Sequence, residues 1–138
     1  MMKRTAINPV SWGDAFSMNQ AEITEDATRV LRCAGQTALV EDPDAPHGLR
    51  VEGVGDIRRQ MEASLAAVDD ILHEAHMERS NIVFIRFYTT DTAGFMANYA
   101  VYADWIKPAH ISPPQTVLGV AALASPELMV EIEVTAAT

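Results

Sequence analysis

The sequence predicts a single α+β domain over residues 1–138, and three patterns carry this prediction. After Asp56, hydrophobic residues recur every three to four positions, which is the period of an amphipathic helix. Ile82–Thr90 is almost continuously apolar, as in a strand with both faces covered. Leu128–Thr135 alternates between apolar and polar residues, as in a strand with one face in the core. The expected order is strand, strand, helix, strand, helix, strand, strand.

Two strands and a loop are predicted before the first helix. Turn signals surround a short strand at Ser17–Thr24. Thr28–Ala34 lies between an acidic turn and Gly35, so we expect a strand that pairs with the preceding one as a hairpin. Glu41–Gly55 is rich in Pro, Gly and Asp and has no periodicity. A surface loop is therefore expected there.

Two helices are predicted, each with a capping residue and one buried stripe. Asp56 is the expected N-cap of the first helix. Asp91 or Thr92 caps the second, which must end before Pro108. The two expected stripes are Ile57, Met61, Leu65, Val68 and Leu72, and then Phe95, Tyr99, Tyr102 and Ile106.

The last two strands are predicted at Gln115–Leu123 and Leu128–Thr135, joined by a turn at residues 124–127. The first is apolar on both faces. Because two helices cover only one face of a sheet, another copy of the chain is expected to cover the second face. In the second strand the apolar face is Leu128, Val130, Ile132 and Val134, and the other face is Met129, Glu131, Glu133 and Thr135.

Composition limits the possible partners and location. The net charge of −9 repels the phosphate backbone of nucleic acids. The longest apolar run, residues 117–124, is far shorter than the ~20 residues that cross a bilayer. A single cysteine agrees with a reducing compartment. We therefore expect a cytoplasmic protein that binds neither nucleic acid nor membrane.

The reactive residue types form no recognisable motif. Cys33 is a candidate nucleophile, but no histidine is near it in sequence and a lone strand cysteine is usually a small buried hydrophobe. His73, Glu74 and His76 are candidate metal ligands, but their spacing is not that of His-Glu-x-x-His and no third ligand is evident. Phosphate-binding and nucleophile-elbow motifs are absent. Neither a metal nor a cofactor is expected.

Several segments together resemble the RidA/YjgF family, the reactive-intermediate deaminases. Their order and approximate spacing carry the resemblance, which extends over almost the whole chain. It implies a subunit that looks like chorismate mutase, and a homotrimer whose sheets form a barrel with three clefts between subunits. The segments are Gln20-Ala21, Ala34-Gly35-Gln36, Phe95–Tyr102, Pro113-Pro114-Gln115 and Val130-Glu131-Ile132-Glu133.

The resemblance also implies a reaction and a site. The best known members hydrolyse enamines and imines, with an arginine that grips the substrate carboxylate and a glutamate that positions water. Glu131 matches that glutamate and is the expected catalytic base, whereas Gln115 stands where the family has the arginine. A neutral amide lacks the charged fork that holds a carboxylate. The expected substrate-binding residues are Gly35, Gln115, Met18, Tyr99 and Val117, of which Met18 replaces the family tyrosine and Tyr99 the family asparagine.

Two classes of function remain open from the sequence. One is a hydrolase or deaminase that acts on a small imine, enamine or related metabolite other than the standard 2-iminopropanoate. The alternative is a non-catalytic trimer that binds a small molecule or a partner protein. Some members are labelled endoribonucleases, which the acidic composition disfavours here.

Overall fold

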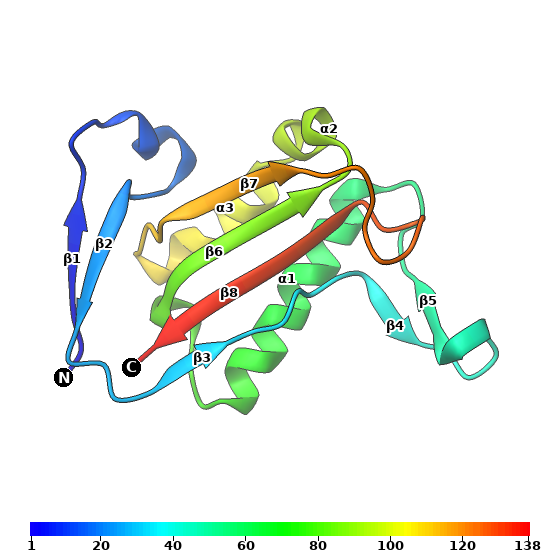
Figure 1. Cartoon of the computed structure of the whole chain (residues 1–138), viewed down its shortest axis with the longest axis horizontal. Coiled ribbons are helices and arrows are strands. Elements are labelled where there is room, and N and C mark those ends of the chain that lie inside the picture. The colour runs from blue at the N-terminus through cyan, green and yellow to red at the C-terminus, as the bar shows by residue number, and fades with distance from the viewer.

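The computed structural model describes residues 1–138 and is built around one four-stranded sheet (Figure 1). Its strands, in spatial order, are β3 (Val30–Arg32), β8 (Val130–Ala137), β6 (Ile82–Thr89) and β7 (Gln115–Gly119). The strand β8 pairs antiparallel with both β3 and β6, whereas β7 pairs parallel with β6. The predicted α+β class is confirmed.

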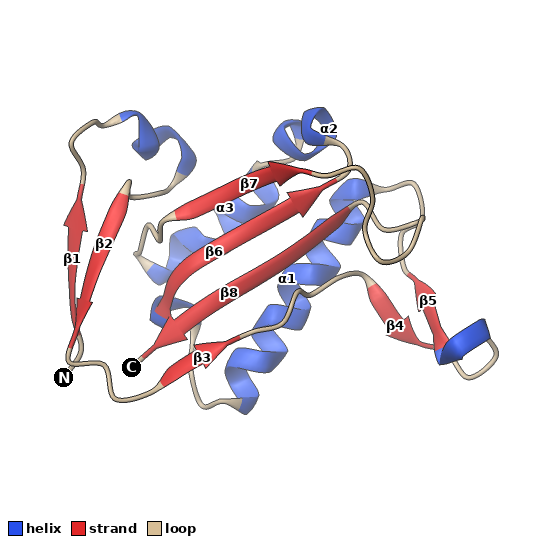
Figure 2. Cartoon of the chain, viewed as in Figure 1, coloured by secondary structure: helices blue, strands red, loops and turns tan.

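The three α-helices lie on one side of this sheet, and its other side carries none (Figure 2). They are α1 (Ile57–Glu74), α2 (Thr92–Ala97) and α3 (Ala100–Ile106). Both predicted stripes face the sheet and are buried, except that Tyr99 is only half-buried. The core therefore lies between the helices and one face of the sheet. None of the helices combines the length and the apolarity needed to cross a bilayer.

The predicted caps are confirmed, but the second helix is divided. The Asp56 carboxylate accepts the Arg59 N–H at 3.1 Å, and the Asp91 carboxylate accepts the Gly94 N–H at 3.0 Å. Asn98 ends α2, because its side-chain Nδ2 donates to the Gly94 carbonyl at 2.9 Å. Asparagine favours such local bonds over a continuing helix. The chain then begins α3 at Ala100.

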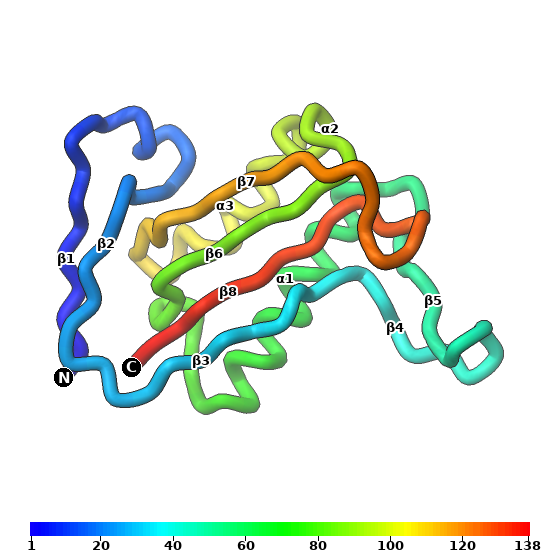
Figure 3. Tube along the Cα trace, in the orientation of Figure 1, coloured from blue at the N-terminus to red at the C-terminus, as the bar shows by residue number.

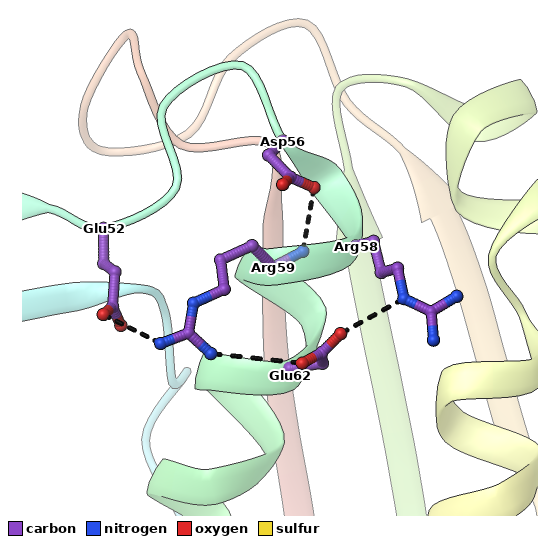
Figure 4. A network of polar contacts seen from close by, with 5 residues as sticks. All are labelled: Glu52, Asp56, Arg58, Arg59 and Glu62. Carbon is purple, nitrogen blue, oxygen red and sulfur yellow. Dashed lines mark hydrogen bonds and ion pairs between the residues drawn. The ribbon is translucent and has the colours of Figure 1, made fainter.

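Charged side chains surround the first turns of α1 (Figure 4). Arg59 bonds Glu52 at 2.9 Å, which ties the helix to the residue after β5 (Leu49–Val51). Arg58 bonds Glu62 at 3.2 Å one turn along. These pairs are largely exposed, so each contributes only about 0.2–1 kcal/mol.

The predicted hairpin between the first two strands is wrong. β2 (Ala21–Glu25) pairs instead with β1 (Lys3–Ile7), a strand that was not predicted from the sequence. Arg4 fixes this hairpin at one end of the molecule (Figure 1), since its guanidinium donates to the carbonyls of Ser80 and Ile82 at 2.6 Å each. The strand β3 pairs with the C-terminal strand β8, because a short strand takes the open edge that the rest of the fold provides.

The expected loop at Glu41–Gly55 contains a second small hairpin. β4 (Leu39–Glu41) pairs with β5, and the turn between them includes the 3₁₀ segment Pro46–Gly48. His47 and Gly48 both adopt positive φ there. Strands of three residues are too short to show an alternating pattern, so composition alone favoured a loop.

The predicted turn between the last two strands required them to be neighbours in the sheet, and they are not. β6 lies between β7 and β8, and the connection arches over the end of the sheet to reach β8 (Figure 3). The strand β7 also ends at Gly119, earlier than the predicted Leu123. The alternation in β8 is as predicted: Leu128, Val130, Ile132 and Val134 are buried.

Candidate functional site

The residues predicted for the site lie on opposite faces of the four-stranded sheet. Phe87 of β6 is fully buried against the helices, and its neighbours in register are Val117 and Ile132. Residues in register share a face, so Val117 and Gln115, two positions apart on β7, both point to the helix side. Glu131 is one position from Ile132 and points to the helix-free side. Within one chain, Gln115 and Glu131 are therefore separated by the sheet.

The helix side holds a cavity of about 290 Å³ at the β7 edge, which we call the Gln115 pocket. It contains four of the predicted residues, Met18, Tyr99, Gln115 and Val117. Three further lining residues, Trp12, Phe16 and Met96, were not predicted. The first two follow turn signals in the sequence, and Met96 lies on the outer side of a helix. Aromatic residues four apart, at 12 and 16, were the available signal for a helical turn with an apolar side.

Hydrogen bonds fix the polar groups of the Gln115 pocket. Gln115 Nε2 donates to the Phe16 carbonyl at 2.9 Å and to the Tyr99 hydroxyl, and that hydroxyl donates to the same carbonyl at 2.6 Å. Burial raises the pKa of Tyr99, although the bond from Gln115 acts in the opposite direction. The phenol therefore stays neutral at physiological pH. Gln115 Oε1 is buried and has no hydrogen-bond partner.

The helix-free side holds the other two predicted residues, Glu131 and Gly35, in contact. A Cβ added at Gly35 would lie 2.6 Å from Cδ of Glu131, so only glycine allows this approach. Two amides nearby are engaged: the Cys33 N–H donates to the Val134 carbonyl at 3.0 Å, and the Gln36 N–H donates to the Ile132 carbonyl at 2.7 Å, whereas the Ala34 N–H between them has no acceptor. The Gly35 N–H has no acceptor in the chain. A carboxylate and a free backbone donor thus lie side by side.

The neighbouring carboxylate, Glu133, is in a different environment. Its Oε1 accepts from Arg86 Nη1 at 2.8 Å and from the Tyr88 hydroxyl at 2.7 Å. Glu131 forms no such ion pair. Arg86 and Arg32 both lie on the helix-free side, since Arg86 is in register with Glu133 and Arg32 with Thr135. Within one chain, neither arginine supplies a positive charge to the Gln115 pocket.

The candidate nucleophile and the candidate metal ligands show no sign of a reactive site. Cys33 is buried, and burial raises the pKa of its thiol, which disfavours the reactive thiolate. His73 lies in the last turn of α1, and His76 follows that helix at a positive φ of 57°. No three His, Cys, Asp or Glu side chains are grouped as metal ligands would be.

Comparison with known proteins identifies the family of the chain. The model of a family described as endoribonuclease L-PSP matches residues 17–138. A crystal structure of YyfB from Yersinia pestis, of the conserved Rid protein family, superposes with a TM-score of 0.79 and 28% identity over 98% of each chain. The chain belongs to the RidA/YjgF family.

Two further relatives support membership in the RidA/YjgF family. A RutC family protein from Aquifex aeolicus is 35% identical over 89 residues, which are 64% of this chain and 68% of that protein. Rv2704 from Mycobacterium tuberculosis, of the YjgF/YER057c/UK114 family, has a TM-score of 0.63 and 25% identity over 99% of this chain and 100% of its own. The family and fold predicted from the sequence are therefore confirmed.

Proposed function

We propose that this RidA/YjgF protein is a hydrolase that deaminates a small imine, enamine or related metabolite, with Glu131 as the base. The observation that carries the proposal is the unpaired Glu131 carboxylate packed against Gly35, whose N–H has no acceptor in the chain. A carboxylate can take a proton from water, and a backbone N–H in fixed position can stabilise negative charge. Both groups are already in place before a substrate arrives.

The reaction follows from these two groups. Glu131 takes a proton from water as the water oxygen bonds to the imine carbon, and the π electrons of the C=N bond pass to nitrogen. Nitrogen takes up a proton, which gives a carbinolamine. The remaining hydroxyl proton is then transferred to the amine nitrogen, the C=O bond re-forms and the C–N bond breaks, which releases ammonia. The Gly35 N–H stabilises the oxygen as it gains negative charge, which is the role of an oxyanion donor.

The two halves of the site are proposed to come from different subunits of a homotrimer. The Gln115 pocket opens on the helix side of the sheet, whereas Glu131 and Gly35 lie on the helix-free side. A substrate bound by one chain can meet the Glu131 of a second chain without passing through a sheet. The helix-free side also has Leu118 exposed to 41%, an apolar surface that a second copy would cover.

A non-catalytic role is the second candidate, and one observation favours it. The Gln115 pocket is lined within one chain and needs neither Glu131 nor Gly35 to hold a ligand. In that case the protein would bind a small molecule without transforming it. Turnover that depends on Glu131 separates the two candidates.

Hydrolysis of 2-iminopropanoate is expected to be weak or absent. The Gln115 pocket has no charged residue, so nothing there holds the substrate carboxylate. In contrast, imines generated in situ by a flavin amine oxidase from amines that lack a carboxylate should be hydrolysed faster when the protein is added. The measurement is the rate at which the imine escapes trapping by semicarbazide. Turnover of 2-iminopropanoate at the rate of an arginine-containing member would contradict the assignment of Gln115.

A further inference from the structure

The Gln115 pocket contains no charged side chain. Six of its seven lining residues are hydrophobic, and the seventh is the Gln115 amide. Moving a carboxylate or an ammonium group from water into such a cavity is unfavourable unless an opposite charge awaits it. The arginines of the sheet lie on its other face, where Arg86 is paired with Glu133 at 2.8 Å. Within one chain, the pocket therefore offers no opposite charge to a charged group of either sign.

Size and shape restrict the ligand further. A cavity of about 150 Å³ holds benzene, and this one measures about 290 Å³. One aromatic ring with a short arm thus fits. Phe16 stands edge-on to both Trp12 and Tyr99, with ring centroids 6.2 and 5.9 Å apart, so its neighbours offer the geometry that aromatic groups prefer. Met18 and Met96 are flexible enough to adjust to the outline of a ligand.

The hydrogen bonds leave one acceptor to be satisfied. Both hydrogens of Gln115 Nε2 are used, one on the Phe16 carbonyl and one on the Tyr99 hydroxyl, and the Tyr99 hydrogen is used on the same carbonyl. Gln115 Oε1 remains without a partner although it is shielded from water. Gln115 lines the pocket, so a ligand that brings an N–H or O–H group can satisfy this oxygen once the amide turns toward it, and such buried groups are costly when left unpaired.

We propose that the Gln115 pocket binds uncharged aromatic or similarly bulky apolar ligands that carry an N–H or O–H donor. This inference rests on the proposed function in treating the pocket as the substrate-binding half of the site. It adds the class of substrate: the neutral imine or enamine of a ring-bearing amine, whose own N–H meets Gln115 Oε1.

Three ligands of the same shape test the proposal by binding alone. Benzamide has an N–H donor and no charge. Acetophenone has no donor and no charge, and benzoate has a negative charge. In a Trp105→Phe variant, Trp12 in the wall of the pocket is the only tryptophan, so its fluorescence reports occupancy. We expect benzamide to bind about three- to tenfold more tightly than acetophenone. Benzoate should bind at least about tenfold more weakly than acetophenone.

A charge substitution provides the matched control. Gln115→Arg should strengthen benzoate binding at least about tenfold, because a guanidinium holds a carboxylate by two hydrogen bonds. If this variant does not fold, the order of the three ligands on the Trp105→Phe protein decides the matter. Benzoate binding as tightly as benzamide, or no binding of any of the three at millimolar concentration, would overturn the proposal. If the three ligands bind in the expected order of affinity but no imine is hydrolysed, the ligand class of the pocket stands and only the proposed hydrolase function is contradicted.

Discussion

Replacing Glu131 with glutamine is expected to lower turnover by about 10²–10⁴-fold and to leave the protein folded and assembled. The amide keeps the size of the side chain beside Gly35 but cannot take a proton from water. No ion pair in the chain is lost, because Glu131 forms none. The rate is measured with the imine that is turned over fastest, and the fold by far-UV circular dichroism.

Glu133→Gln is the matched control on the same strand face. Glu133 lies two residues from Glu131, ~6–7 Å along the strand, too far to hold the same water. Its carboxylate is occupied by Arg86 and Tyr88 at 2.8 and 2.7 Å, so the change weakens that network and leaves Glu131 and Gly35 in place. Activity close to that of the wild type is expected. Equal losses in the two variants would remove Glu131 as the base and favour the non-catalytic role.

Gln60→Leu is expected to destabilise the fold by on the order of 3–5 kcal/mol. Gln60 of α1 is completely buried, and its amide bonds three backbone groups. Nε2 donates to the carbonyls of Gly53 and Glu127 at 3.1 and 2.9 Å, and Oε1 accepts the Met129 N–H at 2.8 Å. Leucine fills the same space but leaves all three groups buried without partners. Urea denaturation followed by circular dichroism gives the free energy of unfolding.

Ser64→Ala tests whether the loss comes from those bonds or from any change on this face of α1. Ser64 is also fully buried on α1, but its hydroxyl has no partner. Its removal is expected to be neutral or slightly stabilising. A Gln60→Leu protein as stable as the wild type would show that the backbone at residues 127–129 does not depend on this anchor, although it leads directly into β8.

Local patterns predicted the parts of the fold that depend on local interactions. The α1 stripe, both aspartate caps and the alternation of β8 follow from periodicity and side-chain chemistry within a few residues. Strand pairing is not local: β3 joins β8 across the whole chain, and β6 separates β7 from β8. Nothing in residues 28–34 or 115–135 specifies those partners. The burial of Gln60 was not predicted either, because a polar residue beside an apolar stripe is usually exposed.

The residues of the site were predicted from the sequence, but their arrangement was not, because it depends on strand pairing. The family resemblance identified Met18, Tyr99, Gln115 and Val117, which the fold brings into one pocket. It also identified Glu131 and Gly35, which the fold brings into contact. Only strand register shows that the two groups lie on opposite faces of the sheet. Because of that separation, the proposed site combines the Gln115 pocket of one chain with the Glu131 of another.

Mixed oligomers of two inactive variants test this claim most directly. Glu131→Gln removes the base, and Met18→Trp fills the Gln115 pocket in the other half of the site. Each variant alone should be inactive in turnover of the imine. In oligomers formed by co-expression, some interfaces pair the intact pocket of one variant with the intact Glu131 of the other.

If the site is shared between the subunits of a trimer, one of the three interfaces in every mixed trimer joins an intact pocket to an intact Glu131, so purified mixed trimers should have about one third of the activity of the wild type. The mixed species are purified by two different affinity tags before the assay, so that only oligomers containing both variants are measured. Mixed oligomers that stay as inactive as their parents would contradict a site formed from two chains.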